Sequence, residues 1–208
     1  MTADPVAPTV VAPPVLTREW IAARLRAGAA PPGDLPQYRH PPDRTPVEAA
    51  VLVPLVNRDT GITVMLTQRT AHLHDHAGQI SFPGGRVDLG DVDRIDTALR
   101  EAAEETGLPR ERVDILGLLP EYDVMSGFRV TPVVGWIEPP VSFVPDPFEV
   151  ADVFEVPLAF LLDPAHHLTQ SRQVDDTLRH WYAMPWEGRH IWGATAGMLH
   201  SLYRILTP

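Results

Sequence analysis

From residue 47 onward, apolar residues gather in short runs that are separated by turns rich in proline, glycine and asparagine. Residues 47–55 form one such run, which predicts a mostly buried strand. Residues 62–69 predict a second strand, which pairs back on the first as a hairpin after turn residues at 57–61. Further strands are predicted at 79–82, 113–119, 128–137, 150–156 and 180–184.

Helical spacing of apolar residues occurs at other places along the chain. Thr17 is a candidate N-cap for a short helix that continues to about residue 26. A second helix is predicted from about 93–96 to 106, where Gly107 ends it. A short helix is expected near residue 161, and a further helix at about 195–205. Strands and helices are mixed without strict alternation, which predicts an α+β fold, a sandwich with a mixed β-sheet.

Composition indicates how the chain is organised. With 208 residues, 44% of them hydrophobic, it can bury the core of one globular domain. Residues 1–16 are rich in proline and alanine and are expected to be a disordered tail. Residues 17–46 are expected to form a helix followed by a proline-rich linker, and residues 47–208 the main domain.

Charge and cysteine content exclude several classes of function. The formal net charge is −10, with 27 acidic against 17 basic residues, which argues against generic nucleic-acid binding. The absence of cysteine excludes disulfides and cysteine-ligated zinc. No long apolar run predicts a membrane span, and no secretory signal is recognisable, so a cytoplasmic location is expected. A polyanionic small molecule still fits as a partner, because a divalent metal can bridge acidic side chains and phosphates.

The predicted helix at 93–106 carries the strongest candidate chemistry. At about 100° per residue, Glu101, Glu104 and Glu105 fall on one side of it, and small apolar residues occupy the opposite arc. Arg100 precedes Glu104 by four residues and is close enough to pair with it. Clustered carboxylates repel one another unless a cation binds, and Mg²⁺ prefers such oxygen ligands. Acidic strings are also common on solvated helix faces, so the neighbouring residues decide between the two interpretations.

Two glycines precede this helix and form a predicted turn, whose backbone can approach metal and phosphates closely. From Gly84 to Leu108 the sequence is GGRVDLGDVDRIDTALREAAEETGL. It resembles the Nudix box, which has Gly, five residues, Glu, seven residues and then Arg-Glu-apolar-x-Glu-Glu-x-Gly-apolar. Asp91 stands where that pattern has Glu, and eight residues rather than seven separate it from Arg100.

The resemblance implies a Nudix-type α/β/α sandwich and a hydrolase of phosphoanhydride bonds that uses Mg²⁺ or Mn²⁺. It implies that Glu101 and Glu105 bind the metal and that Glu104 is a further ligand, directly or through water. Arg100 would orient a glutamate. Glu104 and Glu149, the latter from a later loop, are alternative candidates for the general base.

The substrate phosphates need partners as well. Arg69 and Arg86 are the candidate phosphate contacts among the cations of this region. The backbone of Gly84 and Gly85 is a further candidate substrate-binding element, because its N–H groups can face anions.

A second stretch of sequence narrows the class of expected substrate. Residues 66–85, LTQRTAHLHDHAGQISFPGG, resemble the signature of the coenzyme A diphosphatase branch of the family. The likeness extends over about residues 47–205. It implies cleavage of the pyrophosphate of coenzyme A or its derivatives to 4′-phosphopantetheine and adenosine 3′,5′-bisphosphate. His74 stands where the signature has Arg, which weakens the coenzyme A assignment.

Two other functions are compatible with parts of this pattern. A Nudix enzyme could act on another nucleoside diphosphate derivative, such as a dinucleotide, an ADP-ribose-like compound or a sugar nucleotide, because specificity lies in loops outside the box. A non-catalytic nucleotide sensor of the same fold is disfavoured, because the box acids are present and no basic helix-turn-helix segment is visible. The oligomeric state is left open, a homodimer included.

Several remaining features have a simple structural interpretation beside a functional one. Alternating histidines could share a strand face as a zinc site, although they fit a substrate loop better: His72, His74 and His76. Three tryptophans could stack an adenine, although packing is the simpler interpretation: Trp181, Trp186 and Trp192. Arg129 could contact substrate or pair with an acidic side chain.

Overall fold

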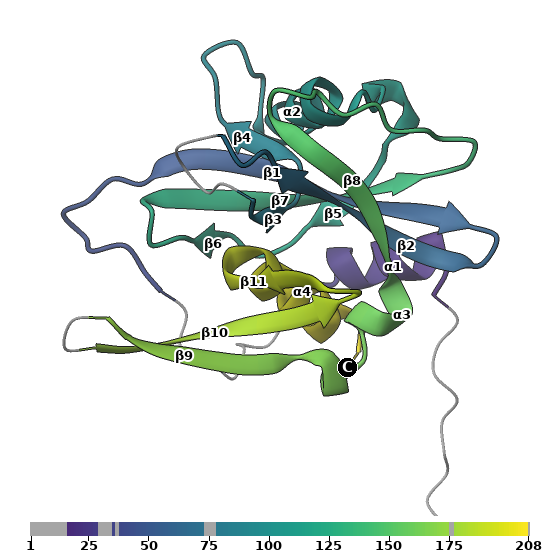
Figure 1. Cartoon of the computed structure of the whole chain (residues 1–208). Coiled ribbons are helices and arrows are strands. Elements are labelled where there is room, and N and C mark those ends of the chain that lie inside the picture. Colours follow the sequence, from purple (N-terminus) through teal and green to yellow (C-terminus); the bar gives the residue numbers. More distant parts are fainter. Residues whose placement is uncertain (1–15, 29–34, 36–37, 73–77, 175–176, 208) are drawn as a thin grey trace, which may run out of the picture.

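A computed structural model describes residues 16–28, 35, 38–72, 78–174 and 177–207 of the chain. Its centre is an eight-stranded mixed sheet (Figure 1). β1 (Val47–Arg58) runs parallel to β7 (Phe128–Ile137) and antiparallel to β2 (Gly61–Arg69). The other strands of this sheet are β3 (Ile80–Ser81), β4 (Gly84–Arg86), β5 (Asp114–Leu118), β6 (Tyr122–Asp123) and β8 (Val150–Pro157). The central path is β3-β2-β1-β7-β5, with β4 on β1, β6 on β7 and β8 on β2.

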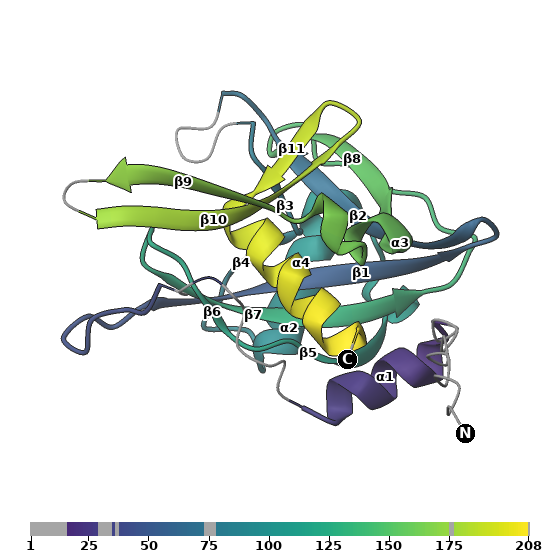
Figure 2. The same ribbon diagram turned by 90° about the horizontal axis from the view of Figure 1, so that it is seen from below.

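Helices cover both faces of the sheet. α2 (Arg94–Thr106) lies on one face, where Ala98 and Ala102 pack into a core with β1 and β7. α1 (Arg18–Arg26) and α4 (Gly193–Leu206) lie on the opposite face and share a second core (Figure 2). A short α3 (Leu158–Leu161) follows β8. This arrangement confirms the predicted α+β sandwich with a mixed sheet.

A second, three-stranded antiparallel sheet lies beside α4 (Figure 1). It consists of β9 (Leu168–Val174), β10 (Thr177–Trp186) and β11 (Arg189–Trp192). The sequence predicted a strand only at 180–184. β9 is exposed along almost its whole length, so its residues show no alternation of apolar and polar positions from which a strand could be predicted.

Local signals at the helix ends are confirmed. The Thr17 hydroxyl accepts a hydrogen bond from the Trp20 N–H at 3.2 Å, and Gly107 ends α2 with φ of 66°. The predicted turn at 57–61 is shorter than expected, because β1 continues to Arg58 and β2 begins at Gly61.

Two expectations fall largely outside the structure. The expected disordered tail lies outside the described residues except at its end, as does much of the proline-rich linker.

In the part of the chain that the structure describes, no helix is both long enough and apolar enough for a membrane span.

Candidate active site

The diglycine segment lies between β1 and α2. It is a strand and not the predicted turn: Gly84–Arg86 pairs antiparallel with residues 49–51 of β1. A Cβ on Gly84 would overlap the carbonyl oxygen of Ala50, and a Cβ on Gly85 would overlap the carboxyl group of Glu101. The turn prediction was wrong because these glycines allow the segment to pack closely against β1 and α2. A strand can require glycine for that reason as well as a turn.

The three helix carboxylates differ sharply in exposure. The side chain of Glu105 is 6% exposed, that of Glu101 19% and that of Glu104 60%. The acidic side of α2 therefore runs from the buried face to solvent. Glu104 alone of the three resembles a residue of a solvated helix face.

Glu105 is a buried acid whose negative charge is only partly compensated by neighbouring groups. Burial raises its pKa to about 8, and the negative charges of Glu101 and Glu149 act in the same direction. Against this, the guanidinium of Arg69 lies 3.8 Å from Oε1, and the Gly84 N–H donates to Oε2 at 3.3 Å. Burial raises the pKa of Glu101 as well. The site thus disfavours the ionised form of Glu105 and Glu101 when no cation is bound.

Arg100 connects the helix carboxylates to the loop before α2. Its Nε and Nη2 donate to the two carboxylate oxygens of Asp91 at 2.8 and 3.0 Å. Its Nη1 donates to Glu101 at 2.9 Å and to Glu104 at 3.2 Å, and Nη2 also reaches the carbonyl oxygen of Arg86 at 3.3 Å. The bidentate pair holds the guanidinium in one plane, so Arg100 orients both glutamates.

Asp91 is the residue whose role the sequence did not predict. Besides Arg100, its carboxylate accepts from the Asp88 N–H at 2.9 Å and the Thr97 hydroxyl at 2.8 Å. The hydrogen bonds from Arg100 hold the pKa of Asp91 well below its usual range, and the same contact raises the pKa of Arg100. The available signal was the position of Asp91 in the box, where the pattern has an acid.

Glu149 comes to the cluster from the loop before β8. Its carbonyl oxygen accepts from the Thr70 N–H at 3.0 Å, which joins this loop to the end of β2. Its negative charge contributes to the raised pKa of both Glu101 and Glu105, so the four acids named by the sequence gather at one site.

The other candidate residues are dispersed. The guanidinium of Arg86 lies over the ring of Phe128, 5.1 Å from its centroid. Arg129 pairs with Asp123 at 2.9 Å, which favours the structural interpretation of this arginine. The exposed His72 meets the ring of Phe148 edge-on, and the other two histidines of the proposed triplet lie outside the described residues.

The donor set fits a hard divalent cation. Among the residues with described positions, no three acidic or histidine side chains enclose a metal by themselves. Mg²⁺ does not need such a cage, because it binds through one or two carboxylates and completes its shell with waters and substrate phosphates. Partly buried, undercompensated carboxylates beside an arginine match that mode of binding.

Comparisons with known proteins identify the family of the chain. The NUDIX domain family model matches residues 46–183. The "Uncharacterized Nudix hydrolase NudL" of Pectobacterium atrosepticum is 45% identical over 173 residues, covering 80% of this chain and 88% of that protein. The protein of the same name from Escherichia coli (strain K12) is 43% identical over 160 residues, covering 74% and 80%. Among solved structures, a Caenorhabditis elegans Ap4A hydrolase is 23% identical and covers 53% of this chain and 80% of its own, with a TM-score of 0.47. The chain therefore belongs to the Nudix hydrolases, which act on pyrophosphate bonds.

Proposed function

We propose that this chain, with Mg²⁺ or Mn²⁺, cleaves the pyrophosphate bond of coenzyme A or its derivatives. The products are 4′-phosphopantetheine and adenosine 3′,5′-bisphosphate. The observation that carries the hydrolytic part is the buried Glu105, whose pKa is about 8 beside Glu101 and Arg69. The choice of substrate rests on the likeness of residues 66–85 to the coenzyme A diphosphatase signature. Residues 47–208 form the proposed hydrolase domain.

Glu101 and Glu105 are the proposed metal ligands, with Glu104 as a further ligand, directly or through water. A bound divalent cation supplies positive charge to the phosphates and lowers the pKa of a coordinated water. Arg69 places its guanidinium 3.8 Å from Glu105, so it can contact a phosphate at the same point. Arg86 and the backbone of the diglycine strand are the other proposed phosphate contacts.

Hydrolysis requires one proton acceptor for the attacking water. The water oxygen forms a bond to phosphorus while the bridging P–O bond breaks, and the proton passes to a carboxylate. Glu149 is partly buried within the cluster. Glu104 is exposed, and its carboxylate accepts a hydrogen bond from Arg100. Both residues are proposed as candidates for this base, and Arg100 as the residue that positions the glutamates.

A substrate panel tests the proposal. The purified chain is assayed with Mg²⁺ or Mn²⁺ on coenzyme A, acyl-coenzyme A, ADP-ribose, NADH, diadenosine polyphosphates and nucleoside triphosphates. Coenzyme A or an acyl derivative is expected to give the highest kcat/KM. Faster turnover of ADP-ribose or NADH would contradict the assignment and favour a hydrolase of other nucleoside diphosphate derivatives.

A further inference from the structure

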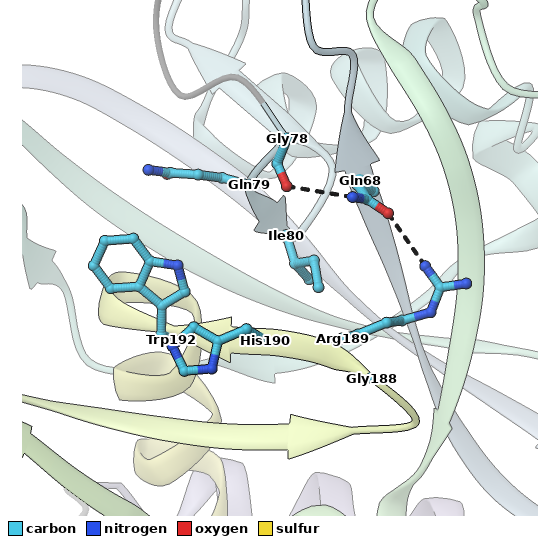
Figure 3. Close-up of a pocket in the computed structure, with 8 residues that line it drawn as sticks. All are labelled: Gln68, Gly78, Gln79, Ile80, Gly188, Arg189, His190 and Trp192. Atoms are coloured by element: carbon cyan, nitrogen blue, oxygen red, sulfur yellow. Dashed lines mark hydrogen bonds between the residues drawn. The ribbon is translucent and has the colours of Figure 1, made fainter.

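The hairpin of β10 and β11 closes a pocket of about 480 Å³ against β2 and β3 (Figure 3). Gln68, Gln79 and Ile80 of the main sheet region form one wall, and His190 and Trp192 of β11 form the other (Figure 3). This volume is in the range of small-molecule sites. The pocket is separate from the carboxylate cluster and has no part in the chemistry described above.

The pocket begins next to the cleavage site. Gln68 precedes Arg69 on β2, and the Arg69 guanidinium lies 3.8 Å from Glu105. Gln68 lines the pocket while the Arg69 guanidinium reaches Glu105, so the pocket and the carboxylates flank the end of β2, where its pairing with β8 shifts register. A substrate held by its phosphates at Arg69 can therefore extend past the end of this strand into the pocket.

The charge of the pocket is largely neutralised. Arg189 pairs with Asp152 at 2.7 Å, and its guanidinium lies 4.0 Å from the centroid of the Phe154 ring. It also donates to the Gln68 side chain at 3.3 Å. Among the described residues of the lining, Ile80 is the single aliphatic one. A neutral polar ring suits these walls better than a phosphate or an acyl chain, because amides and aromatic rings predominate.

Trp192 is the tryptophan that faces this pocket. Its residue exposure is 38%, and the His190 ring lies nearly parallel to it, at 22° and 6.2 Å between centroids. Trp186 packs instead on Phe160, 4.6 Å between centroids, and Trp181 donates to Gln170. An exposed indole at a pocket wall offers a π-face to a nucleobase, whose stacking is largely independent of base identity.

The two walls are held together before any ligand binds. The Thr195 hydroxyl, in the first turn of α4, donates to the carbonyl oxygen of Ile80 at 3.0 Å in a buried position. The Arg189 guanidinium of β11, which donates to Gln68 of β2 at 3.3 Å, joins the two walls directly (Figure 3). A preformed pocket reduces the entropy lost on binding.

We propose that this pocket is the nucleobase subsite of the hydrolase, with the base stacked on Trp192 and its edge against the Gln79 amide. Its assignment to adenine rests on the proposed function. The other half of the substrate, the pantetheine arm, then extends away from this pocket.

Separate binding of the two product halves tests the subsite. Calorimetry on the full chain measures the affinity for adenosine 3′,5′-bisphosphate, AMP and 4′-phosphopantetheine. Trp192→Leu is expected to weaken binding of both adenosine nucleotides roughly 5- to 150-fold, the range of base–aromatic stacking. It should leave 4′-phosphopantetheine unaffected. Trp192→Phe should restore most of the affinity, and Trp20→Leu on α1 is the matched control.

Steady-state kinetics give a second readout. Trp192→Leu should raise KM for the hydrolysed substrate with little change in kcat, and His190→Ala, at an exposed position, should act in the same direction more weakly. Unchanged nucleotide affinity in Trp192→Leu, loss of 4′-phosphopantetheine binding instead, or no nucleotide binding by the wild type would each overturn the subsite. If the wild type binds adenosine nucleotides through Trp192 but does not hydrolyse coenzyme A, the subsite stands and the proposed substrate is wrong.

Discussion

The carboxylate site and the pocket flank the same end of β2, yet the chain assembles them differently. The carboxylates and their arginine come mainly from one continuous stretch, β4 to α2, with Arg69 added from the end of β2 and Glu149 from the loop before β8. The pocket depends on residues far apart, since Gln68 and Arg189 meet across 121 positions of the chain. The proposed cleavage site is thus encoded mainly by one local stretch, while the proposed nucleobase subsite depends on the packing of a separate sheet.

Loss of the Glu105 charge should produce the largest fall in activity. It is the most direct test of whether the carboxylate site, rather than the pocket, performs the cleavage. Glu105→Gln keeps the shape of the side chain but removes a proposed metal ligand. We expect kcat/KM to fall by about 10³-fold or more, because metal charge stabilisation is worth several kcal/mol. Kinetics with Mg²⁺ measure the loss, and circular dichroism checks the fold. Wild-type rates in this variant would mean that the carboxylate cluster is not the catalytic site.

The two adjacent glycines offer a matched pair of substitutions. Gly85→Ala should displace the Glu101 carboxylate and lower kcat by about 10²-fold with little loss of stability, because a small misplacement of a catalytic group is costly. Gly84→Ala should instead destabilise the fold by about 1–3 kcal/mol, since the new Cβ meets the backbone of β1. Activity assays and denaturant unfolding separate the two effects. Equal losses of stability in both variants would contradict the proposed contact with Glu101.

The raised pKa of Glu105 predicts a stability change with pH in protein free of divalent metal. The neutral carboxyl is favoured in the fold, with a pKa of about 8 against an ordinary 4.5. Its contribution is complete below the ordinary pKa and is lost as pH rises through about 8. Thermal unfolding with chelator should therefore show the wild type losing Tm over this window more than Glu105→Gln.

Added Mg²⁺ should reverse that loss near pH 8 in the wild type and much less in Glu105→Gln, because binding to the folded state alone stabilises it. A wild-type Tm profile that matches the variant with and without Mg²⁺ would argue against Glu105 as a metal ligand.

Substitution of Arg129 should give the smallest effect, and it tests whether this residue lies outside the substrate-binding site. Its pair with Asp123 predicts a structural role, so Arg129→Ala should lower Tm by a few degrees, about 2–4 °C, and leave KM for substrate unchanged. Differential scanning calorimetry and steady-state kinetics measure the two quantities. A tenfold rise in KM would place Arg129 in substrate binding.

Elements with strong local signals were predictable from the sequence. The helix caps at Thr17 and Gly107 and the strand at Phe128–Ile137 were confirmed. β9 was missed because an exposed strand lacks apolar alternation, and β4 was taken for a turn because glycine is typical of both. The role of Asp91 was missed because a bidentate partner of Arg100 depends on side-chain geometry across the loop before α2.

By itself, the sequence determined the family and the chemistry that the family performs, because Arg100 and its neighbouring glutamates are set by helical spacing within a few turns. Tertiary structure decided which of those glutamates is buried, since the exposure of Glu105 depends on β4 and β1 packing against α2. It also decided which tryptophan faces a pocket. Burial, pKa and the meeting of distant strands arise from packing between elements, and no local pattern of residues specifies them.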